Sequence, residues 1–124
     1  EKHVKAGTIG KYVIISAGAN VTSDMTADVQ KIIDSAPKGT RLVFVTPYDG
    51  KNKVVLNEFN TYLKSLQNKY NWLAVADWAS YIEPQENRLW ADKIHFAGKQ
   101  DVAIDYLNLL AQSLNEVAKS KGKP

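Results

Sequence analysis

The chain has 124 residues, of which 44% are hydrophobic and 23% charged, and its formal net charge is +3. These values are typical of one globular domain with a real core, and no apolar run approaches the ~20 residues that a membrane span requires. Cysteine is absent, which excludes disulfides, thiolate metal sites and a cysteine nucleophile.

The first half of the chain alternates apolar runs with helical patterns. The β-branched run at 12–15 predicts a strand buried on both faces. Polar cap residues precede a helical spacing over 25–36, which a Pro and a Gly end. A second apolar run at 41–45 predicts another buried strand, and turn residues at 46–50 end it.

The second half continues the alternation and closes with the longest helix. Apolar residues step by three and four over 56–70, which predicts an amphipathic helix. The run at 72–76 predicts a third buried strand. Mixed composition and Pro84 predict an irregular segment with one short helical turn over 79–90. The same apolar spacing predicts the final helix over 103–117.

This order of elements predicts one domain over 1–124 with a parallel sheet and helices on both faces. Ligands of such sheets gather beyond the carboxyl ends of the strands. We therefore expect the loops at 16–22, 46–53, 77–81 and 89–98 to share one edge.

Asp92 and His95 stand three residues apart in a short turn between two ordered segments. An Asp that accepts a hydrogen bond from one ring nitrogen fixes the tautomer of the ring and stabilises the imidazolium that forms when the other nitrogen takes a proton from a nucleophile. The alternative is a surface turn in which the Asp caps and the His is solvated. Asp77 is a second candidate partner for His95, although a role at a helix terminus suits it better.

Three features together resemble the SGNH (GDSL-type) esterase and acyltransferase family. They are the loop Gly18-Ala19-Asn20 after a predicted strand, the turn from Asp92 to His95, and the long helix that follows. The likeness is strongest to the extracytoplasmic domains of bacterial peptidoglycan O-acetyltransferases. It implies a three-layer α/β/α fold of the flavodoxin-like, SGNH hydrolase type.

The resemblance also implies a role for each matching residue. His95 is the expected general base and then acid, and Asp92 orients it. Asn20 is expected to place its amide in the oxyanion hole, and Gly18 to let the backbone approach the reacting centre. The alternatives are a loop Asn that bonds its own backbone and a Gly that serves turn geometry.

The nucleophile of the family is missing from this chain. The family carries its Ser in a Gly-Asp-Ser block, and no Gly-Asp pair occurs here. The loop also has Ala19 where the acetyltransferases usually have Thr, and Val21 where related hydrolases have Asp. Ser16 is the one serine at a strand end near the loop, but it lies one strand away from the expected position, and no other serine suits the role.

We therefore expect the chain to be the C-terminal part of an SGNH-type domain. The N-terminal strand-helix-strand unit, about 30 or more residues, is missing. Without this unit, the strand at 12–15 is expected to expose an edge and apolar faces. An upstream fragment that carries the Ser, or exchange with a second copy, is expected to complete the domain.

Three aromatic residues, Tyr48, Trp90 and Phe96, are candidates for the wall of a substrate pocket, although aromatics beside such turns also anchor loops to the core. No metal site is expected, because His3 and His95 have no spaced carboxylate pair. A phosphate loop is not expected either, because the loop around Gly18 lacks the required glycines and Lys. No cofactor is needed.

The resemblance implies an O-acetyltransferase with accompanying esterase activity. Acetyl would move to or from hydroxyls of a cell-wall glycan, with N-acetylmuramic acid of peptidoglycan as the expected acceptor, through a Ser-His-Asp mechanism. The domain would lie at the outer face of a bacterial membrane, attached to a membrane-embedded acyltransferase portion. The alternatives are a glycan- or partner-binding module that has lost the Ser block, and a secreted carbohydrate esterase. No nucleic acid is expected, and the cluster at Lys119, Lys121 and Lys123 is interpreted as a solvated terminus.

Overall fold

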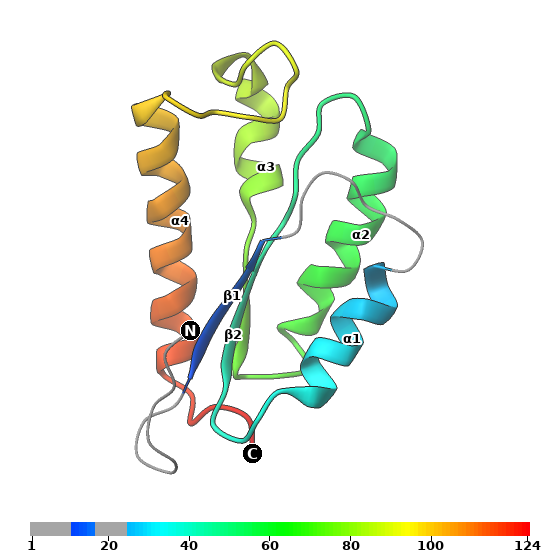
Figure 1. The fold of residues 1–124 in the computed structure, drawn as a ribbon, viewed down its shortest axis with the longest axis vertical. Helices are drawn as coiled ribbons and strands as arrows, with labels where there is room; N and C mark the ends of the chain where they lie inside the picture. The colour runs from blue at the N-terminus through cyan, green and yellow to red at the C-terminus, as the bar shows by residue number, and fades with distance from the viewer. Residues whose placement is uncertain (1–10, 17–24) are drawn as a thin grey trace.

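The computed structural model describes residues 11–16 and 25–124. Three strands form a parallel sheet in the order β1 (Tyr12–Ser16), β2 (Arg41–Val45), β3 (Leu73–Ala76) (Figure 1). Both strand pairs are parallel, so the carboxyl ends of the three strands lie at one edge of the sheet. The α/β fold with a parallel sheet is therefore confirmed.

Helices cover both faces of this sheet (Figure 1). The helices α1 (Met25–Ser35) and α2 (Lys53–Leu66) pack on one face, and α4 (Gln100–Ala118) packs on the other. After β3 come the short helix α3 (Trp78–Ile82) and the 3-10 segment η1 (Glu83–Arg88). In the described part of the chain, no helix combines the length and the apolar character that a membrane crossing demands.

The alternation of side chains along β2 separates two cores. Leu42 and Phe44 pack with apolar residues of α1 and α2. Val43 and Val45 point to the opposite face, where α4 covers them. All four side chains are at most 3% exposed. A strand buried on both faces explains why the sequence run is continuously apolar.

The segment predicted as irregular is more ordered than its composition suggested. Asp77 caps α3, because its side chain accepts a hydrogen bond from the backbone N–H of Ser80 at 3.3 Å. Pro84 lies in the first turn of η1, where a missing N–H costs nothing. The prediction of one short helical turn was therefore too modest.

In the described chain β1 is covered on one face and not on both as its apolar run alone predicted, which agrees with the exposed apolar face expected of a strand that lacks the N-terminal unit. Val13 and Ile15 pack with the core under α1 and α2, but Tyr12 and Ile14 on the other face are 47% and 46% exposed. Within the described residues β1 pairs only with β2, so it is an edge strand there. An apolar run alone does not distinguish a covered face from an uncovered one.

At the opposite edge of the sheet, two outward N–H groups of β3 are bonded within the chain itself. The backbone N–H of Val75 donates to the side-chain oxygen of Gln67 at 3.2 Å, and the N–H of Leu73 donates to the carbonyl of Tyr70 at 3.2 Å. Edge strands are commonly protected from further pairing in such ways.

The basic C-terminal tail is docked, which corrects its interpretation as a solvated terminus. Backbone hydrogen bonds of 2.8 Å join Lys123 to Gly39 and Thr40. The Lys123 ammonium donates to the carbonyls of Ile33 and Asp34 at 2.8 and 2.9 Å. These carbonyls belong to the last turn of α1, where a cation is favourable.

Candidate active site

Loops from three places in the sequence meet at the carboxyl edge of the sheet. The Thr46 hydroxyl donates to the carboxylate of Asp77 at 3.0 Å, which joins the loops after β2 and β3. The backbone N–H of Gly50 donates to the carbonyl of Lys93 at 3.1 Å, which brings in the segment 89–98. Three of the four loops expected at this edge therefore meet there. The fourth lies largely outside the described residues.

Asp92 and His95 form a hydrogen-bonded pair within this edge. Oδ2 of Asp92 lies 2.6 Å from Nδ1 of His95. Oδ1 of Asp92 accepts the backbone N–H groups of Ile94 and His95 at 2.9 and 3.1 Å. One carboxylate thus caps the turn with one oxygen and holds the imidazole with the other. The hydrogen bond between Asp92 and the ring and the capping of the turn are both present, and a catalytic role for the pair stays a prediction.

The hydrogen bonds on Asp92 set its ionisation. The hydrogen bond with His95, followed by those from the two backbone N–H groups, lowers the pKa of Asp92 to about 2. The carboxylate is therefore ionised at neutral pH. With Nδ1 engaged, Nε2 is the ring nitrogen left to exchange a proton, and the His95 side chain is 70% exposed. The carboxylate can therefore orient an imidazole whose other ring nitrogen is open to a partner.

Two backbone hydrogen bonds close the turn between Trp90 and His95. The N–H of Trp90 donates to the carbonyl of His95 at 2.9 Å, and the N–H of Lys93 donates to the carbonyl of Trp90 at 2.8 Å. Lys93 adopts a left-handed backbone conformation with φ of 61°. A non-glycine residue rarely adopts this conformation, so the surrounding contacts must hold it.

Asp77 serves the loops and makes no contact with His95. Its carboxylate accepts hydrogen bonds from Thr46 and Ser80 and lies 3.1 Å from the Lys64 ammonium. Burial raises the pKa of Asp77, but the hydrogen bonds from Ser80, Lys64 and Thr46 outweigh burial and leave the pKa below its ordinary value. Its position agrees with the expected role at a helix terminus.

The three aromatic candidates occupy different environments. Trp90 is 51% exposed, its Nε1 donates to the carbonyl of Ala97 at 2.9 Å, and the Lys99 ammonium lies 4.8 Å from its ring centre. Tyr48 is only 7% exposed. Phe96 packs against Trp78 and Tyr106, with ring centres 5.4 and 5.3 Å apart. Trp90 alone of the three presents a large surface to solvent.

The remaining predictions concern the loop after β1 and the serine at the end of that strand. Gly18 and Asn20 lie outside the described residues. Ser16, at the end of β1, has its hydroxyl 3.3 Å from that of Tyr106. Among the described residues no serine bonds to His95, and no group of three His, Asp or Glu side chains could hold a metal ion.

Sequence reasoning missed Glu86, which links two of the loops. The buried Tyr48 hydroxyl donates a short hydrogen bond to this carboxylate, and the Lys93 ammonium lies 3.1 Å from it. Glu86 belongs to the segment that was predicted to be irregular, and Tyr48 lies 38 residues before it. No sequence signal indicated this contact.

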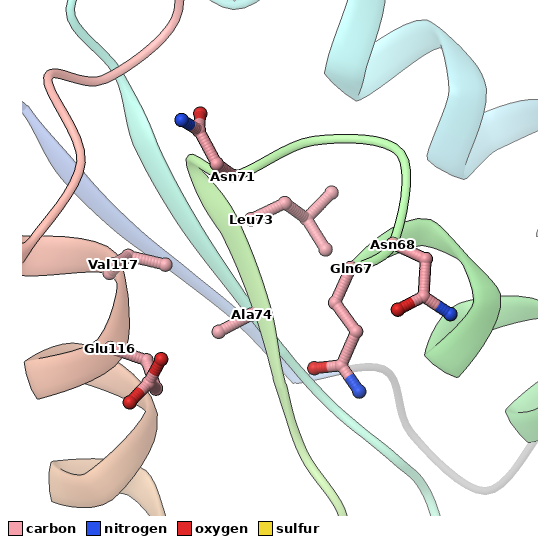
Figure 2. A pocket seen from close by; sticks show the side chains of 7 residues that line it. All are labelled: Gln67, Asn68, Asn71, Leu73, Ala74, Glu116 and Val117. Atoms are coloured by element: carbon pink, nitrogen blue, oxygen red, sulfur yellow. The ribbon is translucent and has the colours of Figure 1, made fainter.

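A shallow groove of about 370 Å³ lies at the opposite end of β3 (Figure 2). Its lining residues are Gln67, Asn68, Asn71, Leu73, Ala74, Glu116 and Val117. None of them belongs to the loops at the carboxyl edge, so the groove is separate from the Asp92 and His95 pair.

Comparison with known proteins identifies one informative likeness. No protein-family model matches the chain, and no curated protein matches it significantly. The chain is similar to the C-terminal catalytic domain of peptidoglycan O-acetyltransferase A from Streptococcus pneumoniae, solved with a methylsulfonyl adduct. The TM-score is 0.77 at 27% identity, over 88% of this chain and 66% of that one. The chain thus spans slightly less than two thirds of the solved domain, and the resemblance to such domains is confirmed.

Proposed function

We propose that this chain is the larger part of an O-acetyltransferase domain that acts on cell-wall glycan and has accompanying esterase activity. The observation that carries the proposal is the Asp92 and His95 pair, at the carboxyl edge of a sheet similar to that of a peptidoglycan O-acetyltransferase domain. An oriented imidazole with one free nitrogen is the part of an acyl-transfer centre that this chain offers.

The proposed reaction has two acyl-transfer steps. Nε2 of His95 takes the proton of a Ser hydroxyl while the Ser oxygen attacks the acetyl carbonyl. The Asn20 amide and backbone N–H groups stabilise the tetrahedral oxyanion. His95 then gives the proton to the leaving alcohol, which leaves an acetyl-Ser. A glycan hydroxyl, or water in the esterase reaction, attacks this ester with His95 again as base, and the Ser is regenerated.

The Ser is proposed to come from an upstream strand-helix-strand unit that pairs with β1. The outward edge of β1 pairs with no described strand, whereas the chain itself caps β3. Roughly a third of the solved relative has no counterpart in this chain, since the match covers 66% of it. That share is large enough to hold the unit.

One flank of α4 offers a surface for the helix of this unit. Glu116 lines the groove beside β3, and Leu107 is nine residues away, which at about 100° per residue places it on the side of α4 that faces away from this groove. Leu107 is 59% exposed, and Ile14 of β1 on the same face of the sheet is 46% exposed. An amphipathic helix over this flank would cover both side chains.

Surface substitutions test the completion of the domain. In the purified material, mass spectrometry and size exclusion should find either an upstream fragment bound to the chain or a second copy of the chain associated with it. Leu107→Glu should weaken that association, whereas Val55→Glu, at an exposed position of α2, should not. A monomeric, well-folded chain without any companion would refute the completion.

Trp90 is proposed to be a platform for a sugar ring of the acceptor. Its indole is exposed, its orientation is fixed by Ala97, and its backbone N–H is bonded to the carbonyl of His95. Tyr48 and Phe96 are proposed to anchor the loops to the core and not to contact the substrate. Trp90→Ala should raise the KM for glycan and leave hydrolysis of a small acetate ester nearly unchanged. Equal effects on both substrates would contradict this role.

The domain is proposed to work outside the cytoplasmic membrane of a bacterium, joined to a membrane-embedded acyltransferase portion that supplies acetyl. The support is the likeness to a domain of a peptidoglycan-modifying enzyme. Cell fractionation with an antibody against this chain should find it in the membrane fraction and accessible to external protease. Recovery in the cytosol would contradict the proposal.

A chromogenic acetate ester tests the function directly. With the Ser-bearing segment restored, the domain should hydrolyse the ester, and His95→Ala should abolish turnover. Turnover that persists in the variant would overturn the proposal. The encoded residues upstream of Glu1 discriminate the second candidate, because a missing Gly-Asp-Ser block would favour a glycan- or partner-binding module.

A further inference from the structure

We infer that Glu86 and Gly50 are positioning residues. Their contacts with Lys93, here called the grip, hold the turn from Asp92 to His95 in the geometry that the proposed reaction needs. This inference rests on the proposed function, since it assigns these residues to the same centre. Glu86 belongs to η1 and Gly50 to the loop after β2, so the grip would join two other segments to the turn.

Lys93 is the point at which the turn is held from outside. It directly follows Asp92 and lies two residues before His95. Its carbonyl accepts the N–H of Gly50 at 3.1 Å, and its ammonium lies 3.1 Å from Oε2 of Glu86. These two contacts hold Lys93 in place, although its φ of 61° is unfavourable for any residue other than glycine. A loosened Lys93 would release the two residues of the pair together.

Glu86 is itself held by contacts with Tyr48 and Lys53. The buried Tyr48 hydroxyl donates to Oε1, and the Lys53 ammonium lies 3.6 Å from the same oxygen. The hydrogen bond from Tyr48, followed by that from Lys93, lowers the pKa of Glu86. Burial, followed by the contact with Glu86, raises the pKa of Tyr48. Near neutral pH the carboxylate is therefore an ionised acceptor and the phenol a protonated donor.

Gly50 is required by the closeness of this packing. A Cβ at this position would lie 2.6 Å from Oε1 of Glu86 and 2.8 Å from Cβ of Lys93. Its φ lies outside the left-handed region, which among the described glycines only Gly39, Gly98 and Gly122 occupy. The lack of a side chain, and not backbone freedom, is thus what Gly50 supplies.

Two conservative variants and two matched controls test the grip. Lys93→Met keeps the aliphatic stem and removes the ammonium, and Glu86→Gln keeps the shape and removes the charge. The controls are Lys51→Met and Glu83→Gln. Lys51 forms no ion pair with a described residue, and Glu83 lies 3.9 Å from Lys53 and makes no ion pair with Lys93. Gly50→Ala, checked for folding by thermal melting, adds a steric probe.

The first readout does not depend on activity. In an NMR titration of this chain, the pKa of Asp92 should rise from about 2 toward 3.8 in Lys93→Met and Glu86→Gln, and should stay in place in the controls. The double variant should shift the pKa of Asp92 no further than either single variant, because each single variant already removes the same contact between Lys93 and Glu86. Unchanged Asp92 titration in both single variants would overturn the inference.

The second readout separates this inference from the proposed function. In the completed domain, each single variant should lower kcat for ester hydrolysis about tenfold with little change in KM, because the base is misaligned. An inactive parent whose Asp92 pKa still responds to Lys93→Met would support the grip and refute the esterase. An active parent with variants that match it in kcat and in Asp92 pKa would refute the grip alone.

Discussion

The carboxylate of Asp92 holds His95 twice, through Nδ1 of the ring at 2.6 Å and through the backbone N–H at 3.1 Å. The residue that orients the imidazole thus also fixes the backbone on which the imidazole stands. Loss of the Asp92 carboxylate would therefore remove the hydrogen bond to the ring and the hydrogen bond to the backbone together, and this coupling leads to the first prediction.

Asp92→Asn should reduce ester hydrolysis by the completed domain roughly a hundredfold or more. An amide keeps the shape of the carboxylate, but it removes the charge that stabilises the imidazolium and can present N–H to Nδ1. The measurement is kcat with a chromogenic acetate ester. Asp77→Asn is the matched control, since Asp77 contacts Thr46, Ser80 and Lys64 instead. Equal loss of activity in both variants would leave the assignment of Asp92 without support.

Acid should destabilise the chain partly through Asp92. The folded state holds the pKa of Asp92 at about 2, below its ordinary 3.8. A depressed pKa means that the unfolded chain binds the proton more readily. The stabilisation from Asp92 is therefore complete above pH 3.8 and is lost as the pH falls through about 2.

Urea unfolding at a series of pH values measures this loss. Between pH ~4 and pH ~2, the free energy of unfolding should fall less steeply in Asp92→Asn than in the parent chain. Asp28→Asn, at an exposed position in the first turn of α1, is the control. Parallel curves for the parent and Asp92→Asn would contradict the assigned shift.

Lys123→Met should lower the free energy of unfolding by about 1 kcal/mol, because the terminal carbonyls of α1 lose a cationic donor. The Met side chain still covers Trp72, whose ring centre lies 5.8 Å from the Lys123 ammonium. Denaturant unfolding at neutral pH gives the value. Lys121→Met, at an exposed position two residues earlier, should change little. An equal effect at both positions would indicate a general charge effect and no docked tail.

Thr46→Val should cost about 2 kcal/mol of unfolding free energy, because it leaves buried polar groups without partners. The Thr46 hydroxyl donates to Asp77 and accepts the N–H of Ala79 at 2.9 Å, and the residue is fully buried. Thr46→Ser, which keeps the hydroxyl, should retain most of the stability. If Val and Ser variants unfold at the same urea concentration, the hydroxyl is not the important group.

Local contacts were the most predictable part of the candidate site. Asp92 and His95 are three residues apart, so one turn of chain determines their meeting, and the sequence indicated it. The Tyr48 contact with Glu86 spans 38 residues and depends on how η1 folds back over the loop after β2. Neither periodicity nor turn chemistry encodes such a contact.

The fold itself followed from alternating apolar runs, because β2 and β3 are buried on both sides and read as continuous hydrophobic segments. The apolar run at β1 did not indicate which face is covered, and Tyr12 and Ile14 are exposed in the described chain, as expected if the N-terminal unit is missing from it. The docking of Lys123 was missed for a related reason. A basic residue near a chain end resembles a solvated tail until the helix end that it caps is placed in space.

In residues 11–16 and 25–124 the edge at β3 has its outward N–H groups bonded and the edge at β1 pairs with no further strand, and this contrast limits how copies of the chain can self-associate. A subunit with one open strand edge can pair with one neighbour, and this pairing uses the open edge of both subunits. Edge-to-edge pairing should therefore stop at two copies and should not propagate into fibres, since Gln67 and Tyr70 already accept the outward N–H groups of β3.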